Sequence, residues 1–216
     1  MLLINPNTSA AVTDGMVGSL RTQLGPHAAV QGVTAAFGAP VIATAAAFAV
    51  AADAALDAWA RRPTGAYDAV VLGCFGDPGL ARLRRVAAVP VIGLADAAFD
   101  AAAQAGEPFA VVTLGPAWGP ILRAQLAVYA AGALCRGVHA LKGSGADMLR
   151  DPAATLHAID RACRALPPDV AAVVLGGAVL AGIGPRLSAP VRFIDPLDCA
   201  AAAVLARTPP LLPGAG

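Results

Sequence analysis

Charged and aromatic side chains are scarce in this sequence of 216 residues. Charged residues make up 13% and aromatic residues 5%, against 57% hydrophobic residues. The 15 basic and 14 acidic residues leave a formal net charge of +1. Binding to nucleic acid or to an acidic membrane surface needs concentrated positive charge, so we expect neither partner. The length and the apolar content predict one large or two small globular domains.

A convincing membrane span or secretion signal is also missing. Residues 34–52 carry no charge and are long enough to cross a bilayer. However, they contain Gly38, Pro40 and many alanines, and their second part continues into a helical pattern. The N-terminus has neither the basic start nor the long apolar run of a signal peptide. We therefore expect a protein of the cytoplasm, with a strand end, a loop and a buried helix over 34–52.

Cysteine occurs four times, without a CxxC pair or a Cys/His cluster at metal-ligand spacing. We therefore predict no metal site, and we expect reduced thiols. Cys163 and Cys199 fall in helical patterns, and together with Cys135 they are typical of small buried hydrophobic residues. Cys74 differs, because it ends an apolar run and glycines surround it.

Short apolar runs alternate with helical patterns along the whole chain. Such runs predict parallel strands that are covered on both faces, and hence an α/β fold. The predicted strands lie at about residues 1–5, 28–36, 68–74, 90–94, 108–115, 136–141, 171–177 and 191–195. One helix is predicted over about 116–131, and a last helix over 196–207, followed by an irregular tail.

The chain contains an internal repeat. AVVLGC at 69–74 returns as AVVLGG at 172–177, and residues 67–94 align with 170–195 as strand, glycine turn, short helix and strand. The repeat predicts two pseudo-symmetric lobes, each a parallel four-stranded sheet flanked by helices. We assign residues 1–95 plus 196–216 to the first lobe and 96–195 to the second. Ligands of open α/β sheets bind beyond the carboxyl ends of the strands, so the active site is expected in the cleft between the lobes.

Cys74 is the strongest candidate for chemistry. It ends a predicted strand just before Asp77 and Pro78, which are typical of a helix start. A helix N-terminus lowers the pKa of a nearby thiol, and Gly73 and Gly76 leave backbone N–H groups accessible. A thiolate beside such donors can move a proton at a carbon next to a carbonyl while the donors hold the developing enolate.

Other polar residues follow neighbouring predicted strands. We expect Asn7 to contact the ligand, and Ser9 to cap the next helix or to offer its hydroxyl. Thr113 either donates to a substrate oxygen or satisfies a backbone carbonyl. The predicted cleft has no obvious charged side chain, because we assign its neighbours Arg82, Arg84 and Arg85 to a solvated helix face. A neutral or ring-shaped substrate is therefore favoured over a free dicarboxylic amino acid.

The segments LLINPNTS, FGAPVIAT, YDAVVLGCFGDPGL, PVIGL and FAVVTLG, in this order, resemble the aspartate/glutamate/hydantoin racemase family, in particular its hydantoin and allantoin racemase branch. The resemblance runs from Leu2 to about Asp195. It implies two pseudo-symmetric lobes, an active site between them, no metal or pyridoxal cofactor, and a homo-oligomer. It also implies two cysteines on opposite sides of the substrate's α-carbon. Cys74 matches the first of these, and Asn7 and Thr113 match polar residues that line the two lobes.

The second catalytic cysteine of the family lies in a motif like LGCAG, and the chain reads LGGAV there, with Gly177 in the place of the thiol. The candidate catalytic positions are Cys74 and Gly177, and the candidate substrate-binding residues are Asn7, Gly73, Phe75, Gly76, Thr113, Leu114, Gly176 and Ala178. The chain is predicted to be a cofactor-independent racemase or isomerase that acts on the acidic α-carbon of a hydantoin or amino-acid-like substrate. Three alternatives stay open: a one-cysteine decarboxylase or tautomerase that protonates one face, a silent ligand-binding homologue, and an engineered glycine.

Overall fold

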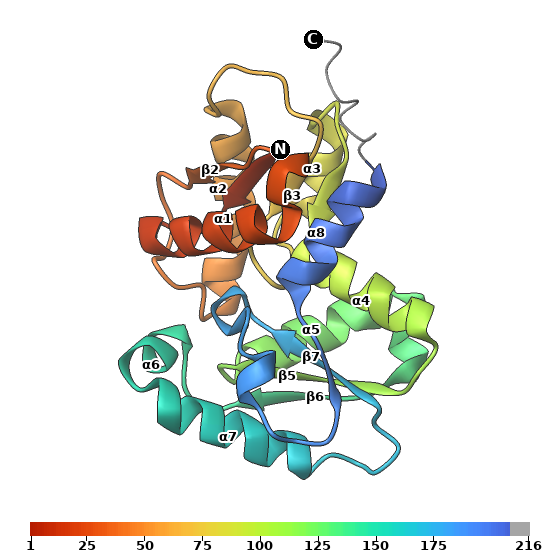
Figure 1. Ribbon diagram of the computed structural model, residues 1–216. Coiled ribbons are helices and arrows are strands. Elements are labelled where there is room, and N and C mark those ends of the chain that lie inside the picture. The colour runs from red at the N-terminus through yellow and green to blue at the C-terminus, as the bar shows by residue number, and fades with distance from the viewer. Residues whose placement is uncertain (208–216) are drawn as a thin grey trace.

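In the computed structural model, each half of the chain builds its own four-stranded sheet, and the two sheets have the same topology (Figure 1). The structure describes residues 1–207. Residues 208–216, which belong to the predicted first lobe and tail, lie outside the described residues. The strand orders are β2-β1-β3-β4 and β6-β5-β7-β8, and every pairing is parallel. The strands are β1 Leu2–Asn5, β2 Gln31–Thr34, β3 Val70–Leu72, β4 Val91–Gly93, β5 Phe109–Leu114, β6 Cys135–Leu141, β7 Ala172–Gly176 and β8 Arg192–Ile194. The predicted fold class is confirmed.

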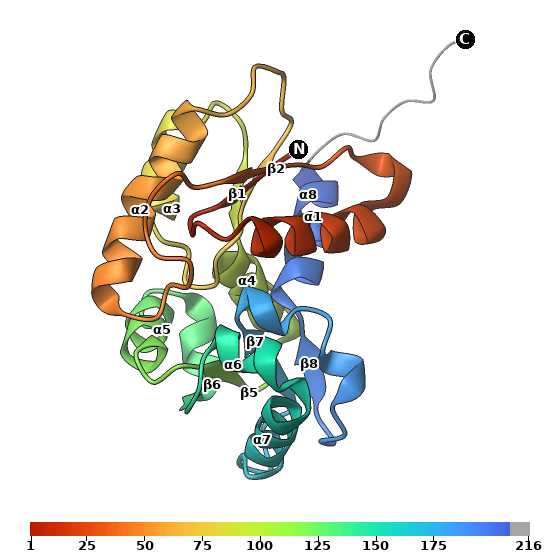
Figure 2. The ribbon, with the colours of Figure 1, turned by 90° about the vertical axis from the view of Figure 1, so that its left-hand side faces the viewer.

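Helices surround the two sheets. They are α1 Ala10–Leu24, α2 Ala45–Ala60, α3 Leu80–Val86, α4 Leu94–Ala105, α5 Trp118–Leu126, α6 Gly145–Arg150, α7 Pro152–Arg164 and α8 Pro196–Arg207. In Figure 2, α1, α2 and α3 lie around the first sheet, and α5, α6 and α7 around the second. The helices α4 and α8 pack on each other at the junction, and both contact β4 and β7. The lobe boundaries at 95/96 and 195/196 stay a proposal, which the contact of α8 with α1 supports.

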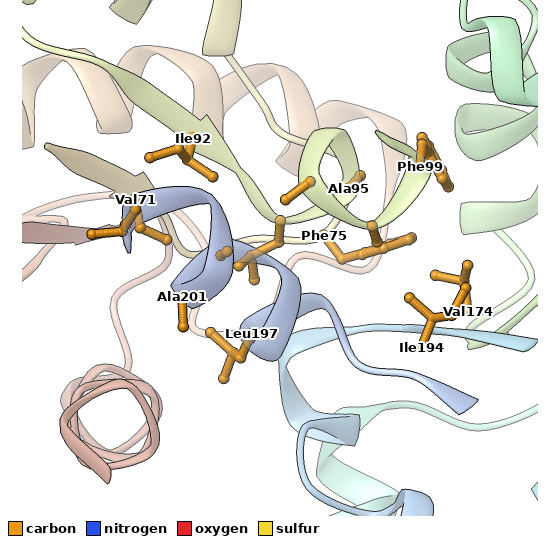
Figure 3. Close-up of a cluster of buried hydrophobic side chains, with 14 of the residues drawn as sticks. Val71, Phe75, Ile92, Ala95, Phe99, Val174, Ile194, Leu197 and Ala201 are labelled. Carbon is orange, nitrogen blue, oxygen red and sulfur yellow. The ribbon is translucent and has the colours of Figure 1, made fainter. Parts of the chain in front are cut away.

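The two lobes share one hydrophobic core. Val71 and Ile92 of the first sheet belong to the same buried cluster as Val174 and Ile194 of the second. Side chains of α4 and α8 join them, including Phe99 (Figure 3). Because interiors are closely packed, this core fixes the end of β3 relative to the end of β7.

The helix starts follow the expected capping chemistry at several places. Ser9 accepts a hydrogen bond from the N–H of Val12 and so caps α1. Asp151 caps α7 in the same way, with Pro152 at the first helical position. Within residues 1–207, none of the helices combines the length and the apolar character needed to cross a bilayer. The uncharged segment 34–52 runs from the end of β2 through a loop into α2.

Candidate active site

The ends of β3 and β7 make the same turn. The N–H of Cys74 donates to the carbonyl of Leu72 at 2.9 Å, and the N–H of Gly177 donates to the carbonyl of Leu175, also at 2.9 Å. The two strands occupy equivalent positions in their sheets, third in sequence and third in strand order. The internal repeat is therefore a repeat in space, and Gly177 is the structural counterpart of Cys74.

A cavity of about 120 Å³ lies between these strand ends, with walls from both lobes. Nine of the predicted site residues line it: Asn7, Gly73, Cys74, Phe75, Thr113, Leu114, Gly176, Gly177 and Ala178. The expectation for Gly76 is not met, because this residue is not among the lining residues. A Cβ at Gly76 would lie 2.8 Å from the ring of Trp118, and its φ of +104° is a backbone conformation that favours glycine. Gly76 therefore serves the turn and the packing beneath the tryptophan.

Sequence reasoning missed several apolar lining residues: Val12, Pro40, Val41, Ile42, Trp118, Gly145, Val179 and Leu180. Trp118 begins α5 and packs edge-on against Phe48 of α2, with ring centroids 5.8 Å apart. Residues 40–42 belong to FGAPVIAT, a segment that the resemblance marked but to which no role was given. That match was the only available signal, because loop residues that cover a cavity have no regular spacing.

Cys74 is the only ionisable side chain among the residues that line the cavity in the described part of the chain. The thiol is 8% exposed, packs with Ile42 and Ala51, and donates a hydrogen bond to the carbonyl of Phe75 at 3.7 Å. Burial raises the pKa of the Cys74 thiol, and the charge of Asp77 raises it further. In the ligand-free site this thiol is a proton donor.

The expectation that a helix start lowers the pKa of Cys74 is therefore wrong. The helix after Cys74 is α3, which begins only at Leu80 and whose N-cap is Gly79. The dipole effect fades within one turn of the helix end, so α3 is too distant to offset the loss of solvent around the sulfur.

Asp77 was predicted to cap the helix that follows it, but it caps a different helix. Its carboxylate accepts hydrogen bonds from the N–H groups of Ala95, at 3.2 Å, and Asp96, at 2.7 Å, in the first turn of α4. The predicted solvated helix face is confirmed, because Arg82, Arg84 and Arg85 are all exposed. Arg82 pairs with the exposed Asp53, and Arg84 pairs with Asp96 and donates to the carbonyl of Val91.

Asn7 presents a free amide group at the edge of the cavity. Its Oδ1 accepts from the Nδ2 of the fully buried Asn5, at 2.8 Å, and from the N–H of Ser9, at 2.9 Å. These two donors fix the orientation of the Asn7 amide. Its Nδ2 makes no hydrogen bond to any residue between 1 and 207, so it is available as a donor to a ligand oxygen.

Thr113 satisfies a backbone carbonyl, which is one of the two alternatives left open by the sequence. Its hydroxyl donates to the carbonyl of Gly176, and the residue is 2% exposed. This bond ties β5 to the residue before Gly177. Beyond that glycine the wall is apolar, formed by Ala178, Val179 and Leu180.

A buried thiol thus lies at the end of a parallel strand and faces the equivalent strand end of the second lobe. Comparison with known proteins identifies the family. The family model described as Asp/Glu/hydantoin racemase matches residues 1–204. The chain belongs to this family.

The relatives that match include hydantoin and allantoin racemases. A hydantoin racemase from Rhizobium meliloti is 42% identical over 74 residues, which are 34% of this chain and 31% of that protein. The matched segment thus spans only about a third of this relative. Two crystal structures of allantoin racemases cover 95% of this chain. The Klebsiella pneumoniae protein is 32% identical to this chain, with a TM-score of 0.86, and the match covers 85% of its length. The Pseudomonas fluorescens protein is 25% identical, with a TM-score of 0.89, and the match covers 88% of its length.

Proposed function

We propose that this protein is a cofactor-independent racemase or isomerase that moves a proton at the acidic α-carbon of a hydantoin or a similar small, neutral amino-acid derivative. Cys74 is its thiol acid/base. The observation that carries the proposal is the placement of this thiol, the one ionisable group that lines the described cavity, opposite its structural counterpart Gly177. The names of the related hydantoin and allantoin racemases support the substrate class.

The lining of the cavity supports a neutral substrate. A buried carboxylate needs a cationic partner or several hydrogen bonds, and no charged side chain lines the cavity in the described residues. A ring with carbonyl oxygens needs only hydrogen-bond donors. Asn7 Nδ2 is one, and the backbone N–H groups of Phe75 and Ala178, which line the cavity, donate to no carbonyl within residues 1–207.

The proton transfer follows from these positions. The Cys74 thiol first loses its proton to solvent, and the thiolate then removes the α-proton. The electron pair of the broken C–H bond moves onto the neighbouring carbonyl oxygen, where the amide and backbone donors stabilise the enolate. Return of the proton from Cys74 regenerates the same enantiomer. Inversion needs a proton on the opposite face, which water delivers because Gly177 carries no acid.

A second candidate is an enzyme that protonates one face only, such as a decarboxylase or tautomerase. The observation that favours it is the wall beyond Gly177, where Ala178, Val179 and Leu180 provide no group that gives or takes a proton. In a decarboxylase, CO₂ leaves, the electron pair of the broken C–C bond stays on the α-carbon, and Cys74 then supplies the proton to that carbon. In a tautomerase, Cys74 removes a proton from one atom and returns it to another on the same face.

The test is to incubate enantiopure 5-substituted hydantoins with the protein in D₂O, and to follow the α-proton by NMR and the optical rotation. We expect exchange that Cys74→Ser reduces by about 100-fold or more, since a positioned general acid/base contributes that much. Cys135→Ser, at a half-buried thiol outside the cavity, is the matched control.

The outcomes separate the alternatives. Exchange with loss of rotation supports a racemase, and exchange with retention supports the one-sided enzyme. Exchange that survives Cys74→Ser would contradict the assigned site. Heat protection by hydantoins without any exchange would identify a silent binding homologue. The cytoplasmic location and the homo-oligomer stay predictions.

A further inference from the structure

Asp77 joins three elements from both halves of the molecule. It lies in the turn after Cys74, and its N–H donates to the carbonyl of Cys74 at 3.0 Å. Its carboxylate is bound to the first turn of α4 through the N–H groups of Ala95 and Asp96. From α5, Gln125 Nε2 approaches the same carboxylate at 3.4 Å. The turn that carries the thiol is thus tied to the helix at the lobe junction and to the second lobe.

The backbone at Asp77 is strained for this purpose. Its φ of +54° is the only positive value at a residue other than glycine among residues 1–207. Such a conformation costs of order 1 kcal/mol or more and persists where the surroundings demand it. A Cβ at Gly93 would lie 2.3 Å from the Asp77 carboxylate. The chain therefore keeps both a strained aspartate and a glycine beneath it, so that this carboxylate fits at the start of α4.

From these contacts we infer that Asp77 is a positioning residue for the reaction at Cys74, and that its carboxylate locks the Cys74 turn onto α4 and α5. Two further features fit this role. Asp77 is 6% exposed, and its structural counterpart in the repeat, Leu180, makes no such connection by its side chain. In the second lobe the chain after β7 is tied differently, through Asp195, whose carboxylate accepts from the N–H groups of Gly182 and Leu197.

The lock also brings a carboxylate close to the thiol, which has electrostatic consequences. The charged groups around it are Asp96 of α4, which accepts a hydrogen bond from the hydroxyl of Tyr129, and Arg84 of α3. Burial raises the pKa of Asp77 to about 7. The hydrogen bonds from the α4 N–H groups and the charge of Arg84 lower this pKa, whereas the charge of Asp96 raises it. At pH above this value the charged carboxylate disfavours the Cys74 thiolate.

The inference rests on the proposed function for its effect on turnover, but a test on the thiol itself does not. We suggest measuring the alkylation rate of Cys74 by iodoacetamide between pH 7 and 10, with the Cys74 peptide quantified by mass spectrometry. Asp77→Asn keeps the shape and one acceptor but removes the charge. A thiol pKa lower by one unit yields about threefold faster alkylation, because the thiolate becomes more abundant while its nucleophilicity falls. We expect an acceleration of this order at pH 8.

Asp77→Gly removes the lock without backbone strain, because glycine adopts a positive φ readily. We expect its kcat for proton exchange to fall about tenfold with little change in KM. Gln125→Leu, which removes one donor at similar volume, should lower kcat by about twofold and keeps the inference testable if the Asp77 variants fail to fold. Asp151→Asn, at the aspartate that caps α7, is the control, and its alkylation and turnover should match the wild type.

A purely structural role would lower the melting temperature of the Asp77 variants without moving the alkylation profile of Cys74. An unchanged profile in Asp77→Asn, or wild-type kcat in both Asp77→Gly and Gln125→Leu, would overturn the inference. If neither the wild type nor any variant turns over hydantoins while the alkylation profile of Asp77→Asn still shifts, the proposed function fails but the electrostatic effect of Asp77 on the Cys74 thiol stands.

Discussion

The backbone and the packing do not require a glycine at position 177. Its φ of 163° is extended backbone that any residue adopts, and a Cβ there would meet no atom closer than 3.7 Å, the Cγ of Leu180. At Gly73 the contrast is plain, because a Cβ would lie 2.8 Å from Met16 Cε. A larger residue before Cys74 must displace the buried side chains of Met16 and Leu3, whereas at Gly177 no such crowding opposes a larger residue.

The variant Gly177→Cys should therefore fold and place a second thiol opposite the first. We expect an unfolding free energy within about 1 kcal/mol of the wild type, since nothing must move. Racemisation should rise by about tenfold or more relative to one-sided exchange, because a positioned acid then serves the second face. Polarimetry and NMR exchange on the same sample give the ratio.

Gly73→Ala is the matched glycine variant for this experiment. Its added methyl group would press on Met16 and Leu3, so we expect destabilisation by about 1–3 kcal/mol. If Gly177→Cys were equally destabilised, the space inferred beside Leu180 would not exist. A stable double-thiol protein whose rate ratio stays at the wild-type value would show that the two strand ends do not face one substrate.

The position of Cys74 at the end of a strand was predictable from the sequence, but the pKa of its thiol was not. The strand, the glycines and the following Asp-Pro pair are local features that spacing reveals. The pKa of the thiol depends on burial beneath residues 40–42 and α2, which come from distant parts of the chain. Asp77 is similar: its type predicts a helix cap, but its partner is α4, because the strained turn points the carboxylate away from α3.

Among the elements, those with a clear apolar pattern were predictable. The last helix, predicted over 196–207, is α8 at Pro196–Arg207, and the two sheets share one strand order, as expected for a repeat. The helix predicted over 116–131 is shorter, because α5 ends at Leu126 and a 3-10 segment follows at Ala130–Leu134. The short helix α6, Gly145–Arg150, was missed, since six residues carry too little periodicity and Ser144 alone marks its start.

The loop between β1 and α1 depends on one buried amide. Asn5 is fully buried, and its Nδ2 donates to Asn7 Oδ1, to the carbonyl of Ser9 and to Thr13 Oγ1. Its Oδ1 accepts from the N–H of Asn7 at 3.1 Å. This single side chain therefore determines where the loop places the free amide of Asn7.

Asn5→Ala should weaken both the loop and the site. We expect a loss of about 2–4 kcal/mol in unfolding free energy, because several buried partners lose their hydrogen bonds, and a several-fold higher KM for hydantoins. Ser9→Ala is the control: it removes only the cap of α1, at a cost of about 1 kcal/mol, and should leave KM unchanged. An equal rise of KM in both variants would show that the start of α1, and not the Asn5 amide, positions Asn7. Denaturant titrations and initial rates measure the two effects.

For the whole molecule, the shared core has a functional consequence. Val174 and Ile194 of the second sheet pack with α4 and α8 in the same cluster as Val71 and Ile92 of the first (Figure 3). The two strand ends that border the cavity are therefore held by one packed body. A buried charge close to this junction, such as Asp77, then acts on the stability of the entire protein and not only on one loop.

The stability of the whole protein should accordingly respond to the titration of Asp77. Burial raises its pKa from 3.8 to about 7, so between these values the folded state holds a proton that the unfolded state releases. The stabilising contribution is complete below about pH 4 and is lost as pH rises through 7. At 1.36 kcal/mol per pKa unit, the change is of the order of 4 kcal/mol. Urea titrations of the wild type and Asp77→Asn from pH 4 to 8.5 isolate it, because all other groups titrate in both proteins. We expect the stability of the wild type to fall relative to the variant across this range, most steeply between pH 5 and 7. Parallel curves for the two proteins would mean that Asp77 is ionised throughout, with its charge fully compensated by Arg84 and the first turn of α4.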